Sequence, residues 1–81
     1  MRKHISPEHQ KRLDGLACYL RELRYNENIT QKEVCAELNI HTNSLCRIEG
    51  GSNTTLCSLF ILCDFYGVPI NVILDGLDNL E

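Results

Sequence analysis

Residues 30–49 constrain the fold of this chain more than any other segment. Thr30 and Glu33 have the spacing of a capping box, which begins a helix, and Asn39 readily adopts the left-handed conformation that ends one. A second short helix is predicted over residues 42–49. Apolar side chains stand where two crossed helices would touch, at Val34, Cys35, Leu38, Ile40, Leu45 and Ile48. The segment therefore predicts two short helices joined by a tight turn.

Three further helices are predicted around this pair. One begins after Ser6, where a capping serine, a proline and an acid suit a helix N-terminus, and ends near Asn26. Others are predicted over about residues 55–66 and 69–74. The last run is rich in β-branched residues, but its length and its initial proline favour a short helix over a strand. The predicted fold class is all-α, a compact five-helix domain.

Length and composition exclude several classes of protein. The 81 residues suffice for one domain with a thin core. No apolar run approaches the ~20 residues that cross a bilayer, and no apolar signal region follows the basic N-terminus, so a cytoplasmic location is expected. The five cysteines are odd in number and include no Cys-x-x-Cys, which argues against a disulfide framework and a zinc site. No catalytic constellation is visible, and neither enzymatic activity nor a cofactor or metal is expected.

Charge is distributed unevenly along the chain. Residues 1–48 carry eight Lys and Arg against six acids, which gives +2, whereas residues 49–81 carry five acids and no base, which gives −5. A basic front and an acidic rear would orient the molecule toward a polyanion. Chance fluctuation of small counts is the alternative interpretation.

Further short matches extend the pattern of residues 30–49. The run Ile29-Thr30-Gln31 precedes and opens the first short helix, Arg47-Ile48-Glu49-Gly50-Gly51 closes the second, and the next helix and its turn contain Leu56, Leu59, Leu62, Gly67 and Val68. Over residues 13–74 the chain thereby resembles the phage repressor/Cro-type (XRE-family) helix-turn-helix domain. The resemblance implies a repressor-like fold in which the helix over 42–49 enters the DNA major groove.

Three positions depart from the family's pattern. Cys35 stands where alanine is usual, and Asn39 stands where glycine is usual. Both replacements are compatible with the fold, because a thiol is only slightly larger than a methyl group and asparagine tolerates positive φ. His41 replaces the usual capping Ser or Thr, which predicts a weaker cap by ~1 kcal/mol.

Base contacts are predicted for Thr42, Asn43 and Arg47, because the N-terminal end of such a helix points at base edges. Asparagine pairs with adenine, arginine pairs with guanine, and threonine can donate, accept or touch a thymine methyl. The resemblance assigns the same positions. The alternative is that these are polar surface residues, which is the favoured interpretation for the neighbouring Cys46.

Phosphate contacts are predicted for Gln31, Lys32 and His41. A helix N-terminus attracts phosphate, and the resemblance implies that Gln31 contacts the DNA backbone and braces the reading helix. The alternative for Gln31 is that it is an ordinary residue in the first turn of the helix. The alternative for His41 is that it is a half-exposed turn residue. The resemblance further implies a structural ion pair between Arg24 and Glu49.

The helix over 55–66 is apolar nearly all round. Its inward face is predicted to contain Leu56, Leu59, Phe60, Leu62 and Cys63, and Cys57, Ile61 and Phe65 form a second stripe. A helix that is apolar on all sides must be covered on all sides. A homodimer is predicted, with its interface at Cys57, Ile61, Phe65, Ile70, Ile73 and Leu74; the alternative is that residues 69–77 cover the stripe within one chain.

The expected function is a transcriptional regulator of repressor type that binds double-stranded DNA as a homodimer on a palindromic site. Residues 1–5, with Arg2 and Lys3, are predicted to form a flexible basic arm, residues 6–75 the DNA-binding domain and residues 76–81 a short tail. Neither a membrane nor a small-molecule ligand is expected. The alternatives are a protein-interaction module with the same fold, favoured by the acidic rear, and a thiol sensor at Cys46, for which no resolving partner is visible.

Overall fold

A computed structural model describes residues 5–78, and all regular secondary structure in this range is helical. The predicted all-α, five-helix fold class is thereby confirmed. Most of the predicted basic arm, residues 1–4, and the end of the predicted tail, residues 79–81, lie outside the described residues. The elements are α1 (Pro7–Asn26), α2 (Gln31–Leu38), α3 (Thr42–Glu49), α4 (Leu56–Tyr66) and α5 (Ile70–Asp78).

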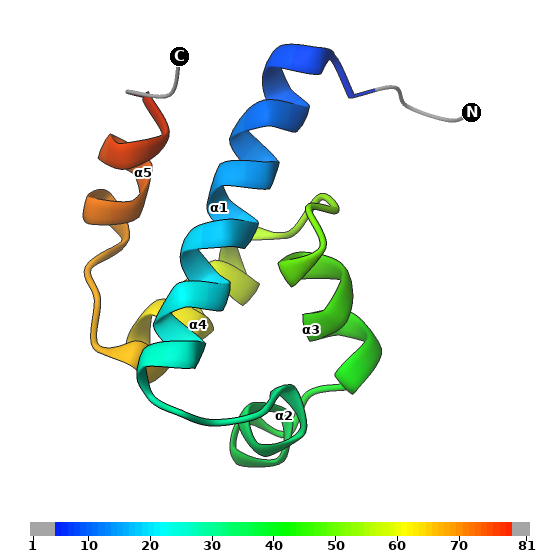
Figure 1. Ribbon diagram of the computed structural model, residues 1–81, viewed down its shortest axis with the longest axis vertical. Helices are drawn as coiled ribbons and strands as arrows, with labels where there is room; N and C mark the ends of the chain where they lie inside the picture. The colour runs from blue at the N-terminus through cyan, green and yellow to red at the C-terminus, as the bar shows by residue number, and fades with distance from the viewer. Residues whose placement is uncertain (1–4, 79–81) are drawn as a thin grey trace.

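The long helix α1 lies at the centre of the domain. In Figure 1, α5 runs along one side of α1 and α3 lies on the other, while α2 closes one end and α4 passes behind. Each helix contributes to one core: Leu20 of α1, Val34 of α2, Leu45 of α3, Leu62 of α4 and Ile73 of α5 are all buried. The core thus fixes the position of α3 relative to α1.

Local capping chemistry sets the helix boundaries. The Ser6 hydroxyl accepts a hydrogen bond from the His9 amide at 3.2 Å. Thr30 and Glu33 exchange the two bonds of a capping box at 3.1 and 2.8 Å. Asn39 ends α2 with φ 55° and Gly67 ends α4 with φ 72°, both left-handed. The ends predicted for the first four helices agree with the observed ones to within one residue.

Helix α5 extends to Asp78, past the start of the predicted tail at residue 76. The additional turn contains Leu77, which packs against the core. Burial of this leucine stabilises the turn even though Gly76 has a poor helix propensity.

The exposed side of α4 differs from the prediction. Its core-facing stripe contains Leu59, Leu62 and Cys63, at positions i, i+3 and i+4. Phe60, predicted to face inward, lies roughly 100° from Leu59 around the helix and is 48% exposed. Leu56, also predicted inward, is the first residue of the helix and is 61% exposed. Phe65, predicted outward, instead packs against the core.

The predicted dimer residues are therefore not all available to a second chain. Cys57, Ile61 and Leu74 are exposed, whereas Phe65 and Ile70 are half-buried. Ile73 is 3% exposed and belongs to the core of one chain, which corrects its assignment to the interface.

No single helix within residues 5–78 combines the length and the apolar character needed to cross a membrane. Helices α4 and α5 meet those criteria only when joined, and the chain bends by 114° between them.

The Tyr66 hydroxyl is buried and has no hydrogen-bond partner among the described residues. Its ring stacks edge-on against Phe65 with 5.1 Å between the centroids. Burial, followed by the negative charge of Glu49, raises the pKa of Tyr66 to about 12, and the positive charge of Arg24 acts in the opposite direction. The folded state therefore favours the neutral phenol.

Because this pKa lies above the ordinary value of 10, Tyr66 contributes stability below about pH 10 that is lost as the pH rises toward 12. The expected loss is about 2 kcal/mol of unfolding free energy. Urea unfolding of the native chain and of Tyr66→Phe at pH 9 to 12 measures it: the variant should lack this component. Tyr25→Phe, which changes an exposed ring, is the control and should keep it. Parallel curves for the native chain and Tyr66→Phe would contradict the assignment.

Candidate nucleic-acid interface

Helix α3 has one face in the core and one in solvent. Leu45, Ile48 and Glu49 are buried, with the spacing i, i+3 and i+4 that places side chains on one helix face. The remaining side chains of the helix are exposed: Thr42, Asn43, Ser44, Cys46 and Arg47. Figure 1 places α3 at the edge of the domain, with α1 on its inner side. The outer face of α3 is therefore open to a partner.

The three residues predicted to contact bases lie together on this open face. Thr42 and Asn43 occupy the first turn of α3, and Arg47 follows Asn43 at i+4, where side chains are neighbours along a helix. Arg47 is the only base on α3, and the only acid, Glu49, is turned inward. The face presents an amide, a hydroxyl and a guanidinium with no carboxylate between them.

The three residues predicted to contact phosphate differ in their surroundings. His41 is the exposed N-cap of α3 and makes no side-chain cap hydrogen bond, as expected from its replacement of Ser or Thr. Lys32 is exposed in the first turn of α2. Gln31 is half-buried, and its Nε2 donates to Glu49 Oε1 at 2.9 Å. Gln31 thus ties the start of α2 to the end of α3.

A buried ion pair holds α3 against α1. Arg24 Nε donates to Glu49 Oε2 at 2.9 Å, and Arg24 Nη2 donates to Oε1 at 3.0 Å, which is a bidentate geometry. Arg24 is 9% exposed and Glu49 2% exposed. The hydrogen bond to Glu49 raises the pKa of Arg24 against the opposing effect of burial. Both residues that the resemblance implies as a structural pair are therefore in contact.

Other groups complete the surroundings of this pair. Arg24 Nη1 donates to the Ile29 carbonyl at 2.9 Å, and the guanidinium lies 4.8 Å from the centre of the Tyr25 ring. Arg21 donates to the Glu49 backbone carbonyl. The sequence reasoning missed Arg21, although its position one turn before Arg24 on the same helix was an available signal.

A polar hollow of about 180 Å³ lies beside Arg47 at the start of α4. Ser44 and Arg47 of α3 face Asn53, Thr54 and Ser58 across it. The N-cap Thr55 also lines the hollow, and its hydroxyl accepts from the Ser58 amide at 3.1 Å. Sequence reasoning assigned no role to this segment, and the signal that it missed was the run of small polar residues directly before a helix N-terminus.

Comparison with protein-family models, curated proteins and solved structures finds no match to this chain. Among residues 5–78, no group of three or more His, Cys, Asp or Glu side chains is arranged to hold a metal ion. The interpretation of α3 therefore depends on its own geometry and on the resemblance of the sequence pattern.

Removal of one member of the buried pair should strand the other charge. We expect Glu49→Ala to lower the unfolding free energy by about 3–5 kcal/mol, and Arg24→Ala to do the same. Chemical denaturation measures both changes. Glu37→Ala removes an exposed acid from α2 and should cost under about 0.5 kcal/mol. The double variant Arg24→Ala with Glu49→Ala should cost less than the two single losses added together, and strict additivity would contradict direct coupling.

Proposed function

We propose that this chain is a sequence-specific DNA-binding regulator of repressor type that inserts α3 into the major groove. The observation that carries the proposal is the exposure of Thr42, Asn43 and Arg47 on a helix whose opposite face is fixed in the core. These side chains supply the donors and acceptors that distinguish base pairs in the major groove. The buried pair of Arg24 and Glu49 supports the proposal because it holds the reading helix at a fixed angle.

Backbone groups around α3 are suited to hold phosphates. The capping box uses the amides of Thr30 and Glu33, which leaves the first-turn amides of Gln31 and Lys32 for an anion. His41 stands at the N-terminus of α3, and the polar hollow beside Arg47 adjoins the N-terminus of α4. His41 directly precedes the reading residue Thr42, and Arg47 itself lines the polar hollow, so phosphate-holding groups adjoin both ends of the proposed reading face.

We further propose that the regulator is a homodimer that uses α4. Leu56, Cys57, Phe60 and Ile61 are exposed at neighbouring positions of that helix and form an apolar surface, here named the α4 patch. Exposed patches of this kind mark contact sites in soluble proteins. A two-fold dimer would set the two α3 helices about 34 Å apart and would bind a palindromic DNA site.

The α4 patch also supports a second candidate, a protein-interaction module that does not bind DNA. The overall charge of −3 favours that candidate, because DNA affinity depends largely on neutralised phosphates. Helices α4 and α5 contain acids and no base, so the exposed flanks of these two helices are unsuited to contact with DNA phosphates.

Selection of bound duplexes from a random pool at about 50 mM salt separates the two candidates. Enrichment of a palindromic sequence, with affinity that falls steeply as salt is raised, is expected for the regulator. Recovery of no sequence above background, together with no retention of any duplex at that salt concentration, would favour the interaction module.

Joint replacement of Asn43 and Arg47 by alanine should remove the preference for the selected sequence. Each lost base contact should weaken specific binding by about 1–3 kcal/mol, and thermal unfolding should be unchanged because both side chains are exposed. Competition between selected and scrambled duplexes measures the preference.

The matched control is Lys11→Ala with Asn71→Ala, which removes the same charge and the same amide from exposed positions of α1 and α5. The control should retain the preference. A preference that survives in the Asn43 and Arg47 variant would overturn the assignment of the reading face.

Phe60→Glu places a charge in the centre of the α4 patch and should raise the dimer dissociation constant at least about tenfold. Sedimentation equilibrium over a range of concentrations measures this constant. Val72→Glu makes the same type of change at a side chain of similar exposure, 47% against 48%, on α5 and should leave the constant unchanged. A native chain that remains monomeric at high concentration would contradict the dimer.

A further inference from the structure

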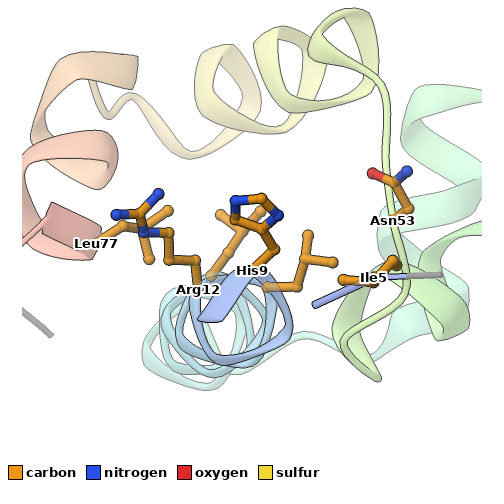
Figure 2. Close-up of a pocket in the computed structure, with 7 residues that line it drawn as sticks. Ile5, His9, Arg12, Asn53 and Leu77 are labelled. Carbon is orange, nitrogen blue, oxygen red and sulfur yellow. The ribbon is translucent and has the colours of Figure 1, made fainter. Parts of the chain in front are cut away.

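A hollow of about 360 Å³ lies between α1, the loop over residues 50–55 and α5. Figure 2 views it along α1, with the side chains of His9 and Arg12 rising from that helix, Leu77 at one end and Asn53 at the other. The volume falls within the range of roughly 300–1,000 Å³ that is typical of small-molecule sites. Its lining contains no residue of α3, although it shares Asn53 with the polar hollow beside Arg47.

The lining combines an apolar body with a few polar groups. Four lining side chains are aliphatic: Ile5, Leu13, Leu16 and Leu77. Among the side chains that the structure describes, the polar members are His9, Arg12 and Asn53, and none of the described lining side chains is acidic. Within residues 5–78, Arg12 has no ion pair or hydrogen bond through its side chain. The hollow therefore offers an unneutralised guanidinium beside aliphatic surface.

The wall formed by the loop is held firmly against α1. Gln10 Nε2 donates to the Gly51 carbonyl at 2.8 Å and to Asp14 Oδ1 at 2.9 Å. Gly51 has φ 94°, which L side chains rarely adopt, and a Cβ there would come within 2.5 Å of Asp14 Oδ1, so a larger residue would strain the loop and displace the Asp14 carboxylate. The position of Asn53, two residues later, depends on this attachment. The hollow is thus formed before any ligand enters.

We propose that this hollow binds a small apolar carboxylic acid in its ionised form. The hydrocarbon part would lie on Leu13, Leu16 and Leu77, and the carboxylate would meet the guanidinium of Arg12. Arginine recognises carboxylates through two parallel N–H donors, and Figure 2 shows Arg12 at the end of the hollow where Leu77 lies. A cavity of about 150 Å³ accepts benzene, so the present volume admits a ring with a short acidic side chain.

This inference departs from the expectation that no small-molecule ligand binds. The lining residues come from positions 5–16, 53 and 77, which are distant in the sequence and converge only through the packing of α1 with α5 and of the loop with α1. No motif in the chain could have indicated the hollow.

The test uses 3-phenylpropionate and its neutral analogue 3-phenylpropan-1-ol, titrated separately into the ¹⁵N-labelled chain at constant ionic strength. We expect the acid to shift amide resonances of residues 9–16, 53 and 77 saturably, with a dissociation constant of about 1 mM for a ligand of about eleven non-hydrogen atoms. The alcohol should bind at least about fivefold more weakly, because it cannot pair with the guanidinium. Equal binding of both compounds would overturn the proposal. So would the lack of a saturable shift with the acid at about ten times the expected dissociation constant.

Arg12→Gln should weaken binding of the acid at least about fivefold and leave binding of the alcohol unchanged, whereas Arg12→Lys should restore part of the preference. Lys11→Gln removes the same charge from the adjacent exposed position, which does not line the hollow, and should have no effect on either titration. Equal weakening by Lys11→Gln and Arg12→Gln would overturn the proposal in favour of general attraction between charges. The titration contains no DNA, so its outcome is independent of the proposed DNA binding.

Discussion

The buried pair of Arg24 and Glu49 is the interaction on which the arrangement of this domain depends. It joins the last turns of α1 and α3, and Gln31 and the Ile29 carbonyl connect it to the start of α2. Burial of two charges is costly, and it is tolerated here because the carboxylate and the guanidinium are each satisfied by several charge-assisted hydrogen bonds. A small core of aliphatic side chains could permit α3 to rotate or slide, whereas a bidentate ion pair has one geometry. The pair therefore adds directional precision to an otherwise non-directional core.

This precision matters because α3 has only eight residues. An isolated helix of that length is unstable in water, so its exposed face exists only while tertiary contacts hold the helix. Leu45 and Ile48 supply apolar contact and Glu49 supplies the anchor, and these three use one face of the helix completely. The other face is then free to carry polar groups that contribute little to stability. The division between supporting and open faces is what makes α3 suited to the proposed role in DNA recognition.

The small size of the domain has a second consequence. A chain of this length cannot cover all of its apolar surface, and the regions left open among the described residues include the α4 patch and the hollow bordered by Arg12. They suit different partners. The α4 patch consists of exposed apolar side chains on one helix, which fits a contact with another protein surface. The hollow is concave and bordered by Arg12, which fits a small anion with an apolar body.

The sequence by itself determined where the first four helices begin and end and which face of α3 is polar. Ser6, Thr30 with Glu33, Asn39 and Gly67 act on backbone groups within four residues of themselves, so their effects can be deduced from local order. Only the tertiary structure decided that Phe60 is exposed while Phe65 is covered, and that Leu77 stabilises the last turn of α5. It also decided that Gln31 reaches Glu49 and that Arg12 borders a hollow. Each of these depends on the angle and distance between helices that are far apart in the chain. Those quantities follow from how whole side chains fill the shared core, and helical periodicity carries no information about them.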